Sequence, residues 1–173
     1  CIRDRVTQWE IPITTSKETS EIGRIVDIDG NFVFSGGIAF VATFQGDIAA
    51  LDARSGRFIW KEKTSTANDL LSSRGKIILI DEKDQVIAYS QNNGDLEWLN
   101  NDFYLRELTS PKKIKSLIVY GDFQGYLHVL DTNQGEQVAR QRISRSKIIS
   151  VSVEEETVLA LDSKGKLSLF TLQ

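Results

Sequence analysis

The fold is decided by a stretch that begins Gly46-Asp47-Ile48-Ala49-Ala50-Leu51-Asp52, turns at Ser55-Gly56 and reaches Trp60. Its first landmark, Gly46, has counterparts at positions 84, 125 and 165, so successive copies lie 38, 41 and 40 residues apart. In the first three copies, a second turn follows the first by ten residues. A fixed period of this size indicates a repeat protein, in which each repeat is one small unit stacked on its neighbours.

Each repeat predicts four short strands, because runs rich in Val, Ile, Leu and Phe alternate with turns containing Gly, Asp, Asn and Ser. No apolar stripe with the period of a helix interrupts them. We therefore predict an all-β fold, a β-propeller of four-stranded antiparallel blades with about four blades present. The expected boundaries are 1–14 for the last strand of a preceding blade, 22–64, 67–100 and 104–143 for three full blades, and 148–173 for three strands of the last blade.

Three tryptophans, Trp9, Trp60 and Trp98, occupy equivalent positions on the fourth and outermost strand of successive repeats. Such a position suits an indole that packs between adjacent blades, so we expect structural anchors and not a ligand platform. In the third copy Ala139 takes this position, and that junction should be less filled. The other expected anchors are the turn glycines Gly46, Gly56, Gly94, Gly125, Gly135 and Gly165.

Composition excludes several functions. The chain has 173 residues and a net charge of −3, which gives no basic footprint for nucleic acid. No apolar run approaches the roughly 20 residues that span a bilayer. With one histidine, His128, and one cysteine, Cys1, no His/Cys metal site or internal disulfide can form. No nucleophile triad or phosphate loop is evident, so we expect no catalytic residues and no cofactor. We expect His128 to pack within a blade.

The strongest candidate for a binding site is the acidic pair Asp27 and Asp29, which lie two apart and would face the same way on a strand. Two carboxylates on one face can hold an Arg or Lys of a partner by charge-assisted hydrogen bonds. The alternative is a simple turn at 29–31 with acidic caps. Arg24 lies nearby and would either neutralise the pair or contact the same partner.

Other charged runs suit solvent-exposed positions. Lys112, Lys113 and Lys115 form a basic turn, and residues 154–156 form an acidic one. The run Arg140, Arg142, Arg145 and Lys147 is typical of the outer face of an edge strand, where charge discourages the addition of another strand.

The repeat, with its Ala-Leu-Asp, Ser-Gly and Trp landmarks, resembles the pyrroloquinoline-quinone (PQQ)-type propeller repeat. Two stretches are similar to the BamB family, the propeller lipoproteins of the bacterial outer-membrane β-barrel assembly (BAM) machinery. They are Glu21-Ile22-Gly23-Arg24-Ile25-Val26-Asp27-Ile28-Asp29, and Arg106-Glu107-Leu108-Thr109-Ser110-Pro111 with the following 119–128. The resemblance covers essentially the whole chain and corresponds to the carboxyl-terminal half of an eight-bladed member.

The resemblance implies a non-enzymatic scaffold at the periplasmic face of the cell outer membrane. Family members bind the periplasmic domains of the barrel-forming subunit BamA and assist insertion of outer-membrane proteins, so unfolded outer-membrane proteins are further candidate partners. The acidic pair of the family's interaction surface corresponds to Asp27 and Asp29. The chain departs from the family at Gly30-Asn31-Phe32, which makes the local backbone less certain. Contact with the membrane would come only through a lipid anchor of the full-length protein, and Cys1 is either an internal residue or such an anchor.

Two alternatives stay open from the residues: a quinoprotein dehydrogenase that uses PQQ and calcium, and a ligand-sensing propeller. We also expect self-association, because an open arc of blades exposes an apolar face at each end, and a second copy could cover both.

Overall fold

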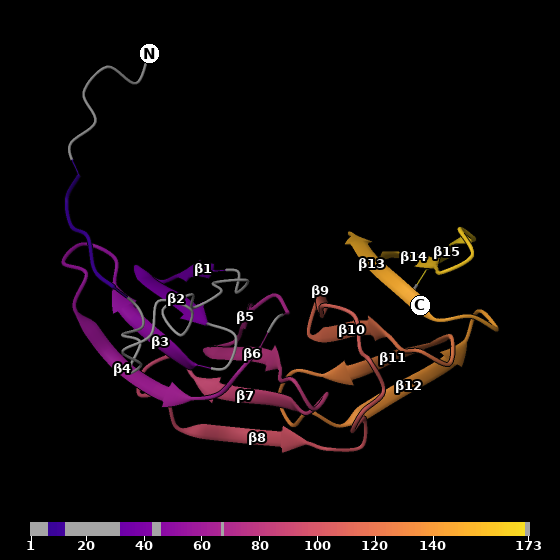
Figure 1. The fold of residues 1–173 in the computed structure, drawn as a ribbon, viewed down its shortest axis with the longest axis horizontal. Coiled ribbons are helices and arrows are strands. Elements are labelled where there is room, and N and C mark those ends of the chain that lie inside the picture. The colour runs from indigo at the N-terminus through magenta and orange to yellow at the C-terminus, as the bar shows by residue number, and fades with distance from the viewer. Residues whose placement is uncertain (1–6, 13–31, 43–45, 67, 172–173) are drawn as a thin grey trace, which may run out of the picture.

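The computed structural model describes residues 7–12, 32–42, 46–66 and 68–171. Fifteen strands form four separate antiparallel sheets, each built from strands that are consecutive in the chain. The sheets follow one another along an open arc, with the first and last at its two ends (Figure 1). The prediction of an all-β fold made of four-stranded antiparallel blades is confirmed for three sheets; the fourth has three strands within the described residues, and no closed ring is seen.

The strands are as follows. The first sheet contains β1 (Phe32–Ser35), β2 (Ile38–Ala42), β3 (Asp47–Asp52) and β4 (Phe58–Lys63). The second contains β5 (Leu71–Ser73), β6 (Lys76–Ile80), β7 (Val86–Ser90) and β8 (Leu96–Asn100). The third contains β9 (Lys112–Ile114), β10 (Leu117–Gly121), β11 (Tyr126–Asp131) and β12 (Gln137–Arg142), and the fourth contains β13 (Ile148–Glu154), β14 (Thr157–Asp162) and β15 (Leu167–Thr171). Among the described residues there is no helix that could cross a membrane.

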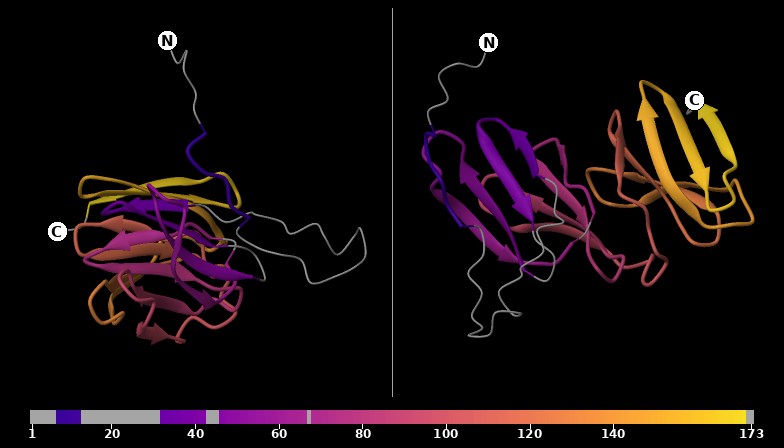
Figure 2. Two further views of the ribbon diagram at one scale, coloured as in Figure 1. Left: turned by 90° about the vertical axis from the view of Figure 1, so that its left-hand side faces the viewer. Right: turned by 45° about the horizontal axis from the view of Figure 1, so that its top comes forward.

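The core consists of the spaces between neighbouring sheets (Figure 2). Strand β6 shows how the sequence builds it, because Ile77 and Leu79 pack toward the first sheet, whereas Ile78 and Ile80 pack toward the third. Alternate residues of a strand point to opposite faces, so a continuous apolar run buries both faces of the blade. The middle strands are therefore uniformly apolar, and polarity appears on the outer strands.

Each tryptophan joins its own segment to the next sheet along the chain. A Cβ added to Gly94 would lie 2.8 Å from Cδ2 of Trp60, so only glycine lets the indole lie flat on this turn. The indole Nε1 of Trp60 also donates a hydrogen bond of 2.8 Å to the carbonyl of Gln91 in the same turn. Equivalent contacts join Trp9 to Gly56 and Ala53, and Trp98 to Gly135 and Thr132.

A β-bulge accompanies each of these outer strands. The register between β3 and β4 shifts between Ala50 and Leu51, so that Ile59 has no partner and Trp60 faces Ala50. The same shift occurs between β7 and β8, and between β11 and β12, where Ala139 faces Val129 in place of a tryptophan. An extra residue bends the strand and increases its twist. The β-bulge is therefore also present in the third sheet, where Ala139 is solvent-exposed. No strand is assigned to residues 7–12, which carry Trp9.

The two terminal sheets expose large apolar side chains. Phe32 and Phe34 of β1 are 68% and 61% exposed, and Leu167 and Leu169 of β15 are 59% and 67% exposed. In the inner sheets the corresponding side chains are covered by a neighbouring blade. Both ends of the arc therefore present unburied apolar surface.

We predict that Trp60→Ala lowers the free energy of unfolding by about 3 to 5 kcal/mol, because it empties the space over Gly94 and leaves the Gln91 carbonyl without its donor. Phe58→Ala on the same strand is the control, since this ring is 42% exposed and its removal opens no cavity. Urea titration of both variants measures the difference. Equal losses, or free quenching of the Trp60 indole by iodide, would contradict the anchoring role.

Candidate partner-binding surface

The connection between β8 and β9, residues 101–111, has an unusual backbone. Leu105 and Glu107 adopt φ angles of 54° and 50°, the left-handed region that side chains other than Gly, Asn and Asp rarely enter. Such conformations persist only where the surrounding structure enforces them, and they cluster at functional sites. This connection is therefore the first place to look for a binding surface.

Asp84 fixes one side of the connection. This residue takes the position of the turn glycines and has a φ of 61°, which aspartate tolerates. Its two carboxylate oxygens accept hydrogen bonds from the backbone N–H groups of Glu107, at 2.8 Å, and Leu108, at 2.9 Å. In addition, the N–H of Leu105 donates to the carbonyl of Lys83. The turn of the second sheet thus holds the connection in its strained form.

Asp122 fixes the other side and is fully buried. Its Oδ2 accepts hydrogen bonds from Arg106, at 2.9 Å from Nε and 2.5 Å from Nη2, and from Nε2 of His128 at 2.8 Å. Its Oδ1 accepts from the N–H groups of Gln124 and Tyr126. Because a carboxylate only accepts, Nε2 of His128 carries a hydrogen in this arrangement. The buried charge is therefore well compensated.

These contacts set the pKa of Asp122. Burial is the largest single effect and raises the pKa, but the hydrogen bonds from His128, from the Tyr126 N–H and from Arg106 together outweigh it and lower the pKa to about 2. Asp122 is therefore ionised at neutral pH and holds Arg106, and with it the connection, against the third sheet.

An aromatic cluster lies beneath the connection. The buried ring of Phe103 packs edge-on against Tyr120 and His128, with centroids 5.3 Å and 4.9 Å apart. Burial, and then the charges of Asp102 and Asp122, raise the pKa of Tyr120 well above its usual value. A polar recess of 240 Å³ adjoins the cluster and is lined by Asp102, Phe103, Arg106, His128, Gln137 and Arg140.

The anchored connection presents apolar side chains to solvent. Tyr104 is 55% exposed, Leu105 is 61% exposed, and Phe123 from the neighbouring turn is 40% exposed. The guanidinium of Arg106 lies over the Phe123 ring, 5.7 Å from its centroid. Exposed aromatic and aliphatic side chains on a rigid support are characteristic of protein-binding surfaces. We call this set, Tyr104, Leu105 and Phe123, the loop surface.

The residues selected from sequence have different outcomes. Asp27, Asp29 and Arg24 lie outside the described residues. Gly46 directly precedes β3, and the positive φ angles of Gly125 and Gly165 match that of Asp84. The basic and acidic turns, expected to be solvated separately, meet in an ion pair between Lys115 and Glu156. His128 packs within its blade and also holds Asp122.

Sequence reasoning missed the roles of Asp84, Asp122 and Arg106. A usable signal was present, because an aspartate (Asp81, Asp122 or Asp162) lies three residues before the second, third and fourth anchors, at positions 84, 125 and 165. All three accept backbone hydrogen bonds from the residues two and four positions later.

We predict that Asp122→Asn lowers the free energy of unfolding by about 3 to 5 kcal/mol at neutral pH, because Arg106 and His128 lose their carboxylate. The folded-state pKa lies below the unfolded value of 3.8, so the stabilisation is complete above that value and is lost as the pH falls through about 2. The difference in the free energy of unfolding between the wild type and the variant should therefore decrease by about 2 kcal/mol in acid. Urea titrations across this range measure it, with the exposed Glu154→Gln as control; a gap that does not change with pH would contradict the assignment.

Comparison with known proteins identifies a family and relatives that this chain resembles. Residues 3–100, more than half of the chain, match the family described as outer membrane protein assembly factor BamB. The chain is 33% identical over 164 residues to the assembly factor BamB of Yersinia pestis and 32% identical over 156 residues to that of Escherichia coli. These alignments cover 94% and 90% of this chain but 42% and 40% of the relatives, so the chain spans less than half of their length.

Solved structures agree on the fold. The crystal structure of BamB from Moraxella catarrhalis matches with a TM-score of 0.82 at 24% identity, over 91% of this chain and 47% of that one. A quinohemoprotein alcohol dehydrogenase from Comamonas testosteroni matches with a TM-score of 0.57 at 21% identity over 67% of this chain and 21% of its own, which shows the shared blade architecture only. The curated relatives are assembly factors by name and not enzymes. On the strength of the matching family model, the chain belongs to the BamB family.

Proposed function

We propose that this chain is part of a non-enzymatic scaffold of the outer-membrane protein assembly machinery, acting at the periplasmic face of the outer membrane. The relatives are named as assembly factors, which supports the process. The observation that carries the binding role is the loop surface, where Leu105 is exposed on a backbone held in a strained conformation by Asp84 and Asp122. Rigid apolar anchors bind at low entropic cost because little conformational freedom is lost on association.

The partner we propose is the barrel-forming subunit, BamA, through its periplasmic domains. The acidic pair Asp27 and Asp29, with Arg24, would supply the charged part of the interface, and the loop surface would supply the apolar part. An interface needs a desolvated apolar centre and a polar rim. The two sets of residues supply these two kinds of contact. Unfolded outer-membrane proteins are a second class of ligand for the same apolar residues, and a lipid anchor would belong to the full-length protein.

We predict that Leu105→Glu weakens binding to the periplasmic domains of the barrel-forming subunit by tenfold or more, on the order of 2 kcal/mol, because a charge would be buried at the centre of the contact. Leu105→Gly should also weaken binding while relaxing the strained backbone. Asp27→Ala with Asp29→Ala should weaken it in the same calorimetric titration without lowering the melting temperature.

The control is Leu96→Glu, the same change at a leucine of β8 that is 57% exposed and lies outside the loop surface. Wild-type affinity for both Leu105 variants would exclude the loop surface from the interface. Wild-type affinity for the double aspartate variant would exclude the acidic pair.

We also infer that this chain self-associates through the two ends of its arc. The exposed rings of Phe32 and Phe34 and the exposed leucines of β15 are apolar faces of the kind that neighbouring blades cover inside the arc. A second copy placed head to tail would cover both ends at once, as a two-fold arrangement allows.

Light scattering over a dilution series tests this inference. We expect the mass to fall from that of a dimer to that of a monomer on dilution, and Phe34→Glu should shift the equilibrium to the monomer because it places a charge in the contact. A monomer mass at every concentration would rule out the association.

A further inference from the structure

Two recesses adjoin each other where the third sheet meets the fourth. One, of 530 Å³, is lined by residues 142–146 of the β12–β13 connection and by Asp162, Lys164 and Lys166 of the β14–β15 turn. The other, of 460 Å³, is lined by Phe123, Gln124, Tyr126, Arg142 and Arg145. The two recesses share Arg142 and Arg145, and we call them together the cationic cleft.

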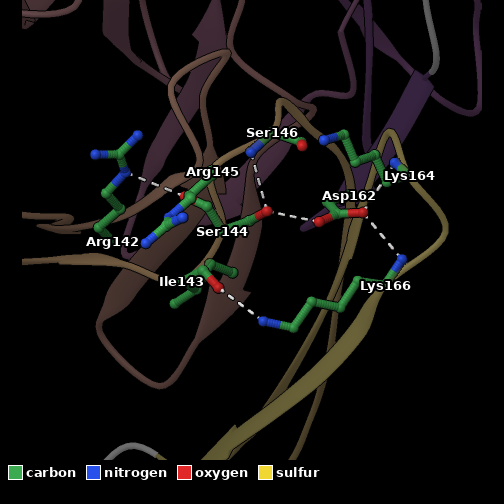
Figure 3. A pocket seen from close by; sticks show the side chains of 8 residues that line it. All are labelled: Arg142, Ile143, Ser144, Arg145, Ser146, Asp162, Lys164 and Lys166. Carbon is green, nitrogen blue, oxygen red and sulfur yellow. Dashed lines mark hydrogen bonds between the residues drawn. The ribbon is translucent and has the colours of Figure 1, made fainter.

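Basic groups line both sides of the larger recess. Figure 3 shows Arg142 and Arg145 on one side of Ser144 and Asp162, and Lys164 and Lys166 on the other. Among the residues that the structure describes, no carboxylate forms an ion pair with Arg142, Arg145 or Lys164. The whole chain carries a net charge of −3, so this cleft opposes the overall sign of the molecule.

The one carboxylate that lines the cleft, Asp162, is buried and accepts three hydrogen bonds. It accepts a hydrogen bond of 2.5 Å from the Ser144 hydroxyl and bonds of 2.9 Å from the N–H groups of Lys164 and Lys166. The Ser144 hydroxyl, followed by these N–H groups, lowers the pKa of Asp162. These hydrogen bonds shape the turn, and among the described residues Asp162 forms no ion pair with an arginine.

The preceding junction shows what is different here. There the equivalent aspartate, Asp122, is held by a cation, Arg106, so positive and negative charges cancel within the protein. At the cleft the same structural task is done by a neutral serine, Ser144. Lys166 donates to the carbonyl of Ile143, and its charge contributes to the lowered pKa of Asp162, whereas Arg142, Arg145 and Lys164 form no ion pair among the described residues.

Arg142 is also held in place. Nε of Arg142 donates to the carbonyl of Ser144 at 3.1 Å, and the guanidinium groups of Arg140 and Arg142 lie over the ring of Tyr126, 4.8 Å and 5.6 Å from its centroid. Stacking on an aromatic ring restricts a guanidinium while leaving its outer N–H groups free to donate. The order needed to bind an anion is thus partly present beforehand.

We propose that the cationic cleft binds an extended acidic polypeptide segment, in which carboxylates two residues apart, on one face of the segment, would pair with Arg142 and Arg145. Guanidinium groups match carboxylates in bidentate geometry. Two neighbouring recesses that share Arg142 and Arg145 suit alternate side chains of one strand-like peptide, whereas a plane of lipid phosphates would meet only the outermost cations. This site borders the loop surface, because Phe123 lines the smaller recess, but the arginines of the cleft are not part of that surface.

The test uses a fluorescein-labelled peptide, Gly-Ser-Glu-Phe-Glu-Ser-Gly, in a fluorescence anisotropy titration of the purified protein. We expect saturable binding that weakens as salt is added, because the pairs lie at the surface. The Gln-Phe-Gln version should bind on the order of tenfold more weakly or worse, and Arg142→Gln with Arg145→Gln should cause a similar loss. Lys164→Gln with Lys166→Gln tests the opposite wall and serves if the arginine variant fails to fold.

The matched control is Arg54→Gln with Arg57→Gln, which removes the same charge at an exposed turn of the first sheet and should leave the affinity unchanged. The proposal is overturned if the glutamate peptide does not bind, if the glutamine peptide binds equally well, or if the control variant loses as much affinity as the arginine variant. Sedimentation with equimolar phosphatidylglycerol and phosphatidylcholine vesicles separates the other source of anions: arginine-dependent vesicle binding without peptide binding would assign the cleft to lipid.

Discussion

The contact between a tryptophan of one blade and a glycine turn of the next is the constraint on which the rest of the structure depends. The apolar faces of the blades would attract one another in many orientations, because the hydrophobic effect has no direction. The indole adds direction, since its ring requires a turn without a side chain and its N–H requires a carbonyl at a fixed position, as Trp60 finds at Gly94 and Gln91. Contacts of this kind join the first sheet to the second through Trp60 and the second to the third through Trp98, and Trp9 joins its segment to the first sheet.

A second repeated element, the aspartate three residues before the last three anchor positions, connects the fold to the proposed binding surfaces. One oxygen of Asp122 shapes its own turn, while the other holds Arg106 of the preceding connection. At Asp162 the same second oxygen holds Ser144. At the first of these junctions the aspartate pairs with Arg106, which neutralises its charge and holds the loop. At the next junction the aspartate binds the neutral Ser144, and the arginines of the cleft form no ion pair among the described residues. The chemistry of each junction depends on which residue meets that oxygen.

The period of the sequence was sufficient to predict strands, sheets and their order, because burial on both faces of a blade forces an apolar run between two turns. The positions of Trp60 and Trp98 followed from the same spacing. The loop surface could not be predicted in this way. Leu105 and Glu107 adopt left-handed backbone conformations in a connection that Asp84 and Asp122 hold from both sides, and those contacts join residues from different repeats. Local propensity contains no information about them, although the recurring aspartates were visible in the chain.

The bulge beside each outer strand has a further consequence. It is retained beside Ala139, where no indole is present, so the geometry of that strand is a property of the backbone and not of the side chain it carries. A blade can therefore lose its tryptophan in evolution without losing its shape, and the junction that follows becomes free to change its stability. In a linear array coupled only through nearest neighbours, such a junction is a natural boundary between cooperative units. The cationic cleft lies at this junction.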